Sequence, residues 1–110
     1  MKWDNVLDRL EAAGLKPVEE FYMENYGKVL AVDRPEFKGR YFRCTFGEVR
    51  CAGLLIEAFI FPSELQREEF LEVIGDNPWY IPASNVVLHF PETDPGLIDN
   101  ILWALSASPL

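Results

Sequence analysis

A glutamate and the only histidine of the chain are the residues best suited to acid–base chemistry, and both fall in apolar, strand-like segments. Glu57 interrupts the run 52–61, and His89 lies in the segment 85–90. If the two strands are neighbours, Glu57 could orient the His89 imidazole beside a thiol nucleophile. The sequence has no nucleophile motif and no oxyanion element. It therefore favours a structural histidine and a carboxylate exposed at a sheet edge or after a bulge at Gly53.

Cys44 and Cys51 form the second candidate for chemistry. A two-residue turn at Gly47 and Glu48 would set the two cysteines opposite each other in a hairpin, at a separation that a disulfide can span. A cytosolic chain favours two reduced core thiols instead. The spacing of the cysteines is not that of a redox or zinc motif, and a single histidine offers few further ligands, so neither a metal nor a cofactor is expected.

The same hairpin register divides the side chains between two faces. One face is apolar and holds Phe42, Cys44, Phe46, Val49 and Cys51. The other holds Tyr41, Arg43, Thr45 and Arg50. Basic and aromatic residues that interleave in this way resemble an RNA-binding sheet, but the exposed aromatic platform is too small, and no nucleic-acid partner is expected. Arg43 and Arg50 are predicted to pair with acids in the other half of the chain or to bind an acidic partner, and Tyr41, the aromatic residue beside them, is a further candidate for contact.

Two further groups of residues are candidates for binding. Glu64, Glu68 and Glu72 give the predicted helix 64–74 an acidic outer surface, which is typical of a solvated helix and also fits recognition of a basic protein. Trp79 and Tyr80, together with Glu57 and His89, are candidates to line a ligand pocket. In so small a domain, the two aromatic residues are more often part of the core.

Length and charge narrow the class of protein. The 110 residues, 49% of them hydrophobic, predict one compact domain that spans residues 1–110. The net charge is −8, and residues 51–110 hold nine acids and one base, Arg67. This imbalance argues against a general nucleic-acid binder. The sequence shows no signal peptide and no apolar run of membrane-spanning length, so a cytoplasmic protein without membrane contact is expected.

Hydrophobic periodicity predicts three helices and six strands. The predicted helices cover 4–13, 64–74 and 95–106. The predicted strands cover 18–24, 28–33, the two arms of the hairpin around 47–48, 79–81 and 85–90. The strand that follows Cys51 is apolar on both faces and is expected to be central or to adjoin a partner. The order αββββαββα fits an α+β fold with helices on one face of a mainly antiparallel sheet of five or six strands.

Two stretches resemble families of small uncharacterised bacterial α+β proteins. The first is Leu10-Glu11-Ala12-Ala13-Gly14-Leu15, near the start, and the second, near the end, comprises Asn85-Val86-Val87-Leu88 and, after five intervening residues, Asp94-Pro95-Gly96-Leu97-Ile98. The resemblance implies a compact bacterial domain and supplies no catalytic residues.

Taken together, these features predict a non-enzymatic interaction domain that binds another protein or associates with itself as a homodimer. One alternative is a small-ligand-binding domain with a pocket between sheet and helices. Others are an acidic inhibitor of a basic or nucleic-acid-binding protein, and an enzyme that uses Glu57, His89 or a cysteine.

Overall fold

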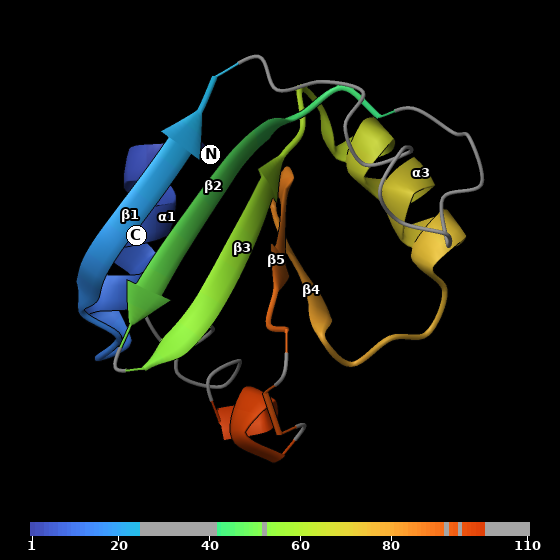
Figure 1. The fold of residues 1–110 in the computed structure, drawn as a ribbon. Helices are drawn as coiled ribbons and strands as arrows, with labels where there is room; N and C mark the ends of the chain where they lie inside the picture. Colours follow the sequence, from blue (N-terminus) through green and yellow to red (C-terminus); the bar gives the residue numbers. More distant parts are fainter. Residues whose placement is uncertain (25–41, 52, 92, 95, 101–110) are drawn as a thin grey trace.

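The fold is seen in a computed structural model, which describes residues 1–24, 42–51, 53–91, 93–94 and 96–100. In chain order the elements are α1 (Trp3–Ala12), β1 (Pro17–Met23), β2 (Thr45–Cys51), β3 (Leu54–Ile60), α3 (Glu64–Ile74), β4 (Tyr80–Ala83) and β5 (Val86–His89). Residues 96–100 are also helical. Figure 1 shows these elements arranged around one twisted sheet.

The sheet has five strands in the order β1-β2-β3-β5-β4, and every neighbouring pair is antiparallel. This confirms the predicted α+β class. It also confirms that the strand after Cys51 is central, because β3 lies between β2 and β5. The side chains of β3 alternate between two apolar cores, which explains why this strand is apolar on both faces.

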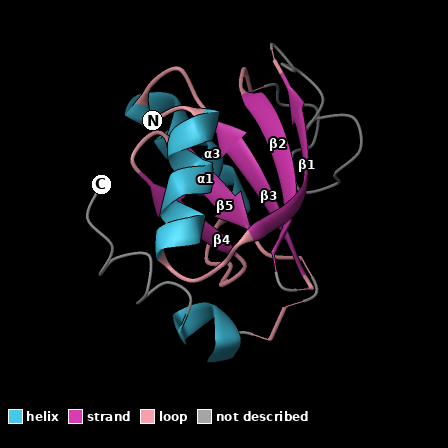
Figure 2. Cartoon of the chain, turned by 90° about the vertical axis from the view of Figure 1, so that its left-hand side faces the viewer, coloured by secondary structure: helices cyan, strands magenta, loops and turns pink. Residues whose placement is uncertain are grey.

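The helix α1 covers one face of the sheet. Its buried residues, Trp3, Val6 and Leu10, recur at helical spacing and pack with Val49 and Ile56 in one core. Gly14, at a φ of +86°, takes the left-handed conformation just after the helix. The Trp3 ring lies against the backbone of β2 at a glycine, and Figure 2 shows the helix alongside the strands.

The helix α3 belongs to the opposite face. Ser63 caps it, and its hydroxyl oxygen accepts a hydrogen bond from the Gln66 amide at 3.3 Å. Phe70 is fully buried and packs with Phe59 and Phe61 of the second core. The expectation that the helices share one face is therefore wrong, because the double-sided β3 needs a cover on each side.

The predicted hairpin turn at residues 47–48 is also wrong. β2 continues through these residues, and the turn lies between Cys51 and Leu54, which are Cα partners. The Trp3 ring packs directly over Gly47, and a Cβ at this position would overlap the ring. The absence of a side chain at this glycine thus allows close packing of the ring on the strand, and the glycine does not form a turn.

The remaining predictions agree with the structure or fall outside it. The predicted segments 4–13, 18–24, 64–74, 79–81 and 85–90 correspond to α1, β1, α3, β4 and β5. The strand predicted at 28–33 and the part of the third helix beyond residue 100 lie outside the described residues. Within the described part of the chain, no helix is both long and apolar enough to cross a membrane.

Candidate interaction surface

Exposed apolar side chains of the described residues gather on β1. The exposed fractions are 75% for Val18, 51% for Phe21, 40% for Tyr22 and 38% for Met23. The other large exposed apolar residues that the structure describes, Leu65 and Leu97, stand singly on other elements. Scattered apolar residues are normal on a protein surface, whereas several on one strand make that strand a candidate for contact with a partner.

Within the described sheet, β1 is an edge strand, and its two halves differ. The first half begins with Pro17, and its pairing with β2 shifts register between Pro17 and Glu19. Proline and local irregularity are common means of protecting a sheet edge from pairing with another chain. The second half, Glu20 to Met23, pairs regularly with Val49 to Phe46. The half that lacks these protective features is therefore the one that carries three of the four exposed apolar residues.

The side chains of this half point to both faces of the sheet. Phe21 and Met23 lie opposite Glu48 and Phe46, on the α3 side. Tyr22 lies on the α1 side, where its ring stacks on Trp3 with the centroids 5.5 Å apart and the planes 9° apart. Three exposed acids, Glu19, Glu20 and Glu24, flank the apolar residues. A partner of β1 would therefore meet apolar surface framed by carboxylates.

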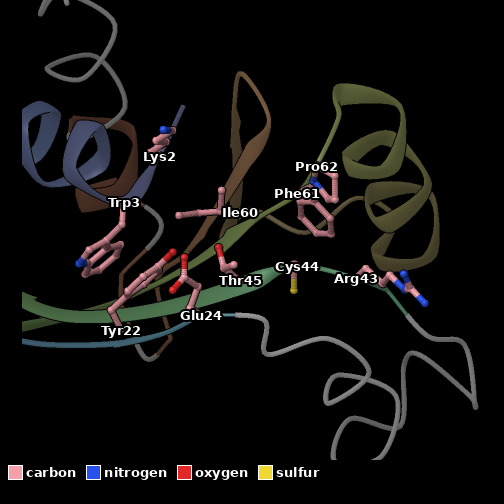
Figure 3. A pocket seen from close by; sticks show the side chains of 10 residues that line it. All are labelled: Lys2, Trp3, Tyr22, Glu24, Arg43, Cys44, Thr45, Ile60, Phe61 and Pro62. Atoms are coloured by element: carbon pink, nitrogen blue, oxygen red, sulfur yellow. The ribbon is translucent and has the colours of Figure 1, made fainter.

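A groove with a volume of about 630 Å³ opens at the end of β1. Trp3 and Tyr22 form one wall, and Phe61 and Pro62 form the other, as Figure 3 shows. Thr45 lines the groove between the two walls. The groove thus joins the start of α1 to the strand ends of β1, β2 and β3.

Charged residues stand at the rim of the groove. Lys2 and Arg43 are basic, and Glu24 is acidic. In Figure 3 the sulfur of Cys44 points away from the Thr45 hydroxyl, toward the other side of β2. The side of the groove seen in Figure 3 therefore carries the Thr45 hydroxyl and not a thiol, and the Arg43 guanidinium points away from it.

Glu57 and His89 come together as the sequence analysis suggested. They are Cα partners on β3 and β5, and Glu57 Oε1 lies 2.7 Å from His89 Nδ1. On the other side of the imidazole, the Tyr80 ring stacks at a centroid distance of 4.2 Å and an angle of 13°. The expectation that Glu57 is exposed at a sheet edge is wrong. Glu57 lies in the central strand β3, and its side chain is only 13% exposed.

The arrangement of Glu57 and His89 fits a structural role. The carboxylate orients the ring through Nδ1, and the Tyr80 ring covers one of its faces. Cys51 belongs to the core on the opposite face of the sheet, and Cys44 lies just before β2. The structure thus brings together an acid and a base but places no thiol beside them. Among the described residues, no group of three or more metal-ligating side chains is present.

The disulfide suggested for the two cysteines does not form. Cys44 and Cys51 are free and buried, and they lie seven positions apart on one extended segment, which is roughly 20 Å. A disulfide requires Cα atoms within about 7 Å. Burial raises the pKa of the Cys44 thiol from 9.0 to about 12 and also raises the pKa of Cys51. Both residues are therefore buried free thiols whose pKa is raised.

The charged residues predicted to bind partners are dispersed. Arg43 lies at the groove rim, whereas the even-numbered Arg50 points to the α3 side of β2, so the two do not share the predicted face. Tyr41 lies outside the described residues. The three acids of α3 are exposed, as predicted: Glu64, Glu68 and Glu72.

The structure also has a depression beside α3. An open depression of about 530 Å³ runs beside the acidic face of α3, where Glu68, Glu72, Asp76 and the Tyr80 ring line it.

Trp79 packs at the boundary of both cores, and its Nε1 donates a hydrogen bond to the Thr93 carbonyl at 2.7 Å. None of the four residues predicted to line a ligand pocket, Glu57, Trp79, Tyr80 and His89, lines the groove at the end of β1, and of the four only Tyr80 lines the depression beside α3.

Comparisons with protein-family models, with curated proteins and with solved structures find no match for this chain.

Proposed function

We propose that this protein is a non-enzymatic interaction domain in which β1 accepts an extended segment of another protein as an added strand. The observation that carries the proposal is the second half of β1, Glu20 to Met23, which is regularly paired and carries exposed apolar side chains at an edge of the described sheet. An added strand would pair with the main-chain groups of that edge. Its alternate side chains would cover Phe21 and Met23 on one face and Tyr22 on the other.

The charges around β1 indicate the chemistry of the partner. Glu19, Glu20 and Glu24 are exposed beside the apolar residues. Opposite charges across two strands stabilise their pairing, and like charges destabilise it. The net charge of −8 also attracts a basic partner from a distance. The favoured partner is therefore an extended segment that alternates apolar residues with lysine or arginine. A second copy is disfavoured because it would bring one acidic strand against another.

A synthetic peptide that alternates valine and lysine tests this proposal. The same peptide with glutamate in place of lysine is the matched control. Hydrogen exchange of the whole chain is measured with and without each peptide, and the affinity of the labelled peptide is measured at low and high salt. We expect the lysine peptide to protect the amides of β1 and to bind more weakly as salt rises, and the glutamate peptide to do neither.

Two variants that each add one negative charge test whether peptide binding depends on β1 or on another part of the surface. Phe21→Glu places a charge in the exposed half of β1, and we expect it to abolish binding. Leu65→Glu changes an apolar residue that is 70% exposed on α3, and we expect binding to persist. Protection of α3 in place of β1 would contradict the proposal and would favour the acidic-inhibitor alternative. A dimer of the unliganded chain that Phe21→Glu dissociates would assign β1 to self-association instead.

A further inference from the structure

Tyr22 is held upright at the edge of the sheet by its neighbours. Its Cα partner on β2 is Gly47, and the Trp3 ring fills the space above that glycine. The Tyr22 ring stacks on Trp3 with 9° between the planes, and the exposed fractions are 40% for Tyr22 and 7% for Trp3. One face of the Tyr22 ring therefore lies against Trp3, and the other face is turned away from β2 toward the open side of β1.

A carboxylate lies next to this ring on the same side of the sheet. Glu20 is exposed and precedes Tyr22 by two positions on β1, so both side chains point to the α1 side. In Figure 3 Glu24 also stands beside Tyr22, whereas Lys2 stands across the groove at the start of α1. The open face of the ring is thus combined with a negative charge.

The α3 side of the same edge is apolar. Phe21 and Met23 are successive side chains on that side, and they are 51% and 38% exposed. An added strand that alternates apolar and basic residues would therefore place its apolar side chains on the α3 side and its basic side chains on the α1 side. In this arrangement, one basic residue lies opposite Tyr22.

We infer, on the basis of the strand addition proposed above, that the residue opposite Tyr22 is an arginine, whose guanidinium stacks on the open face of the ring and pairs with Glu20. The planar guanidinium stacks on aromatic rings and matches the geometry of a carboxylate, whereas the lysine ammonium is a compact, strongly hydrated charge. Diagonal neighbours on adjacent strands are about 7–8 Å apart, which a long side chain can span. Tyr22 and Glu20 thus form a recognition site for one arginine of the partner.

Two peptides of equal charge provide the probes. One alternates valine with arginine, and the other alternates valine with lysine. Hydrogen exchange of the whole chain shows whether each peptide protects the amides of β1, and a titration gives its affinity. We expect both peptides to protect β1 and the arginine peptide to bind about two- to fivefold more tightly. Tyr22→Leu should make the two affinities equal, whereas Tyr22→Phe, which keeps the ring, should preserve the preference for arginine.

Two adjacent acids provide a matched control for the side of the sheet. Glu19 and Glu20 are both exposed, but Glu19 points to the α3 side, where its Cα partner is Arg50. Glu20→Gln should weaken binding of the arginine peptide about two- to fivefold, and Glu19→Gln should weaken it less. Circular dichroism checks the folding of every variant. If Tyr22→Leu does not fold, the comparison of the two glutamine variants still decides.

The results separate this inference from the strand addition on which it rests. If neither peptide protects β1, strand addition is wrong and the arginine site is wrong with it. If both peptides protect β1 but bind the unaltered chain equally well, the arginine site alone is wrong. The same conclusion follows if Tyr22→Leu retains the preference for arginine, or if the two glutamine variants have equal effects.

Discussion

Nδ1 of His89 lies 2.7 Å from Oε1 of Glu57, and the two side chains are only 12% and 13% exposed. A carboxylate in the central strand of a sheet loses much of its hydration, and the imidazole compensates for that loss. The Tyr80 ring packs against the other side of the imidazole. Side chains that are cross-strand neighbours therefore connect the three adjacent strands β3, β5 and β4.

The first prediction concerns the coupling of Glu57 and His89. Either Glu57→Leu or His89→Leu alone should lower the free energy of unfolding by about 2–4 kcal/mol, because each removes the direct contact between two mostly buried polar side chains. The double variant should recover part of this loss, since two apolar side chains of similar size can pack together. Urea unfolding of the four proteins gives a coupling energy of about 1–3 kcal/mol.

A double variant whose loss equals the sum of the two single losses would contradict this prediction. Such additivity would mean that Glu57 and His89 contribute independently to stability. Leu55→Ala combined with His89→Leu is the control, because Leu55 lies on the same strand and pairs with β2 rather than β5.

Much of the fold could be predicted from the sequence because local signals set it. Helix α3 has a serine cap, and the strand after Cys51 has the continuous apolar character of a central strand. The error at residues 47–48 has a specific cause. A glycine followed by a polar residue is typical of a turn, but here a tryptophan more than forty residues earlier packs over Gly47. Such close packing cannot be seen in the local sequence.

The site was harder to predict than the fold. The approach of Glu57 to His89 could be inferred because it required only that two apolar strands be neighbours. The exposure of Phe21 and Met23 could not, because aromatic and apolar residues on a strand usually indicate burial. The groove draws on residues from four separated segments of the chain, and sequence spacing alone does not reveal such a site.

The second prediction tests the packing of Trp3 on Gly47. Gly47→Ala should lower the free energy of unfolding by about 1–3 kcal/mol, because the added methyl group overlaps the ring and forces it to move. Gly96→Ala is the matched control. Its Cβ would have its nearest neighbour, an Asp94 oxygen, at 3.7 Å, and it lies at the start of a helical segment. Thermal unfolding of both variants is the measurement, and equal melting temperatures would contradict the packing described.

The third prediction concerns the reactivity of the cysteines. Cys44 and Cys51 are 5% and 0% exposed, and burial raises the pKa of both thiols, so little thiolate is available at neutral pH. We expect Ellman's reagent to react slowly with the native protein and rapidly with both thiols after denaturation in guanidinium. Addition of reductant should leave the mass and the melting temperature unchanged. Rapid reaction of either thiol in the native protein would show that its segment opens readily.

The last prediction concerns alkaline pH. The pKa of Cys44 is raised from 9.0 to about 12 in the folded protein, so the unfolded chain releases this proton first as pH rises. The stabilisation from the protonated thiol is complete below pH 9 and is lost as the pH rises toward the folded value. Between these values, the free energy of unfolding should fall by up to about 1.4 kcal/mol per pH unit from this group alone.

The variant Cys44→Ala is the control, because it removes this contribution, whereas tyrosine and lysine titrate in both proteins. The stability difference between wild type and Cys44→Ala, measured by urea unfolding, should therefore shrink as the pH rises above 9. A difference that stays constant with pH would mean that the Cys44 thiol is hydrated in the folded protein.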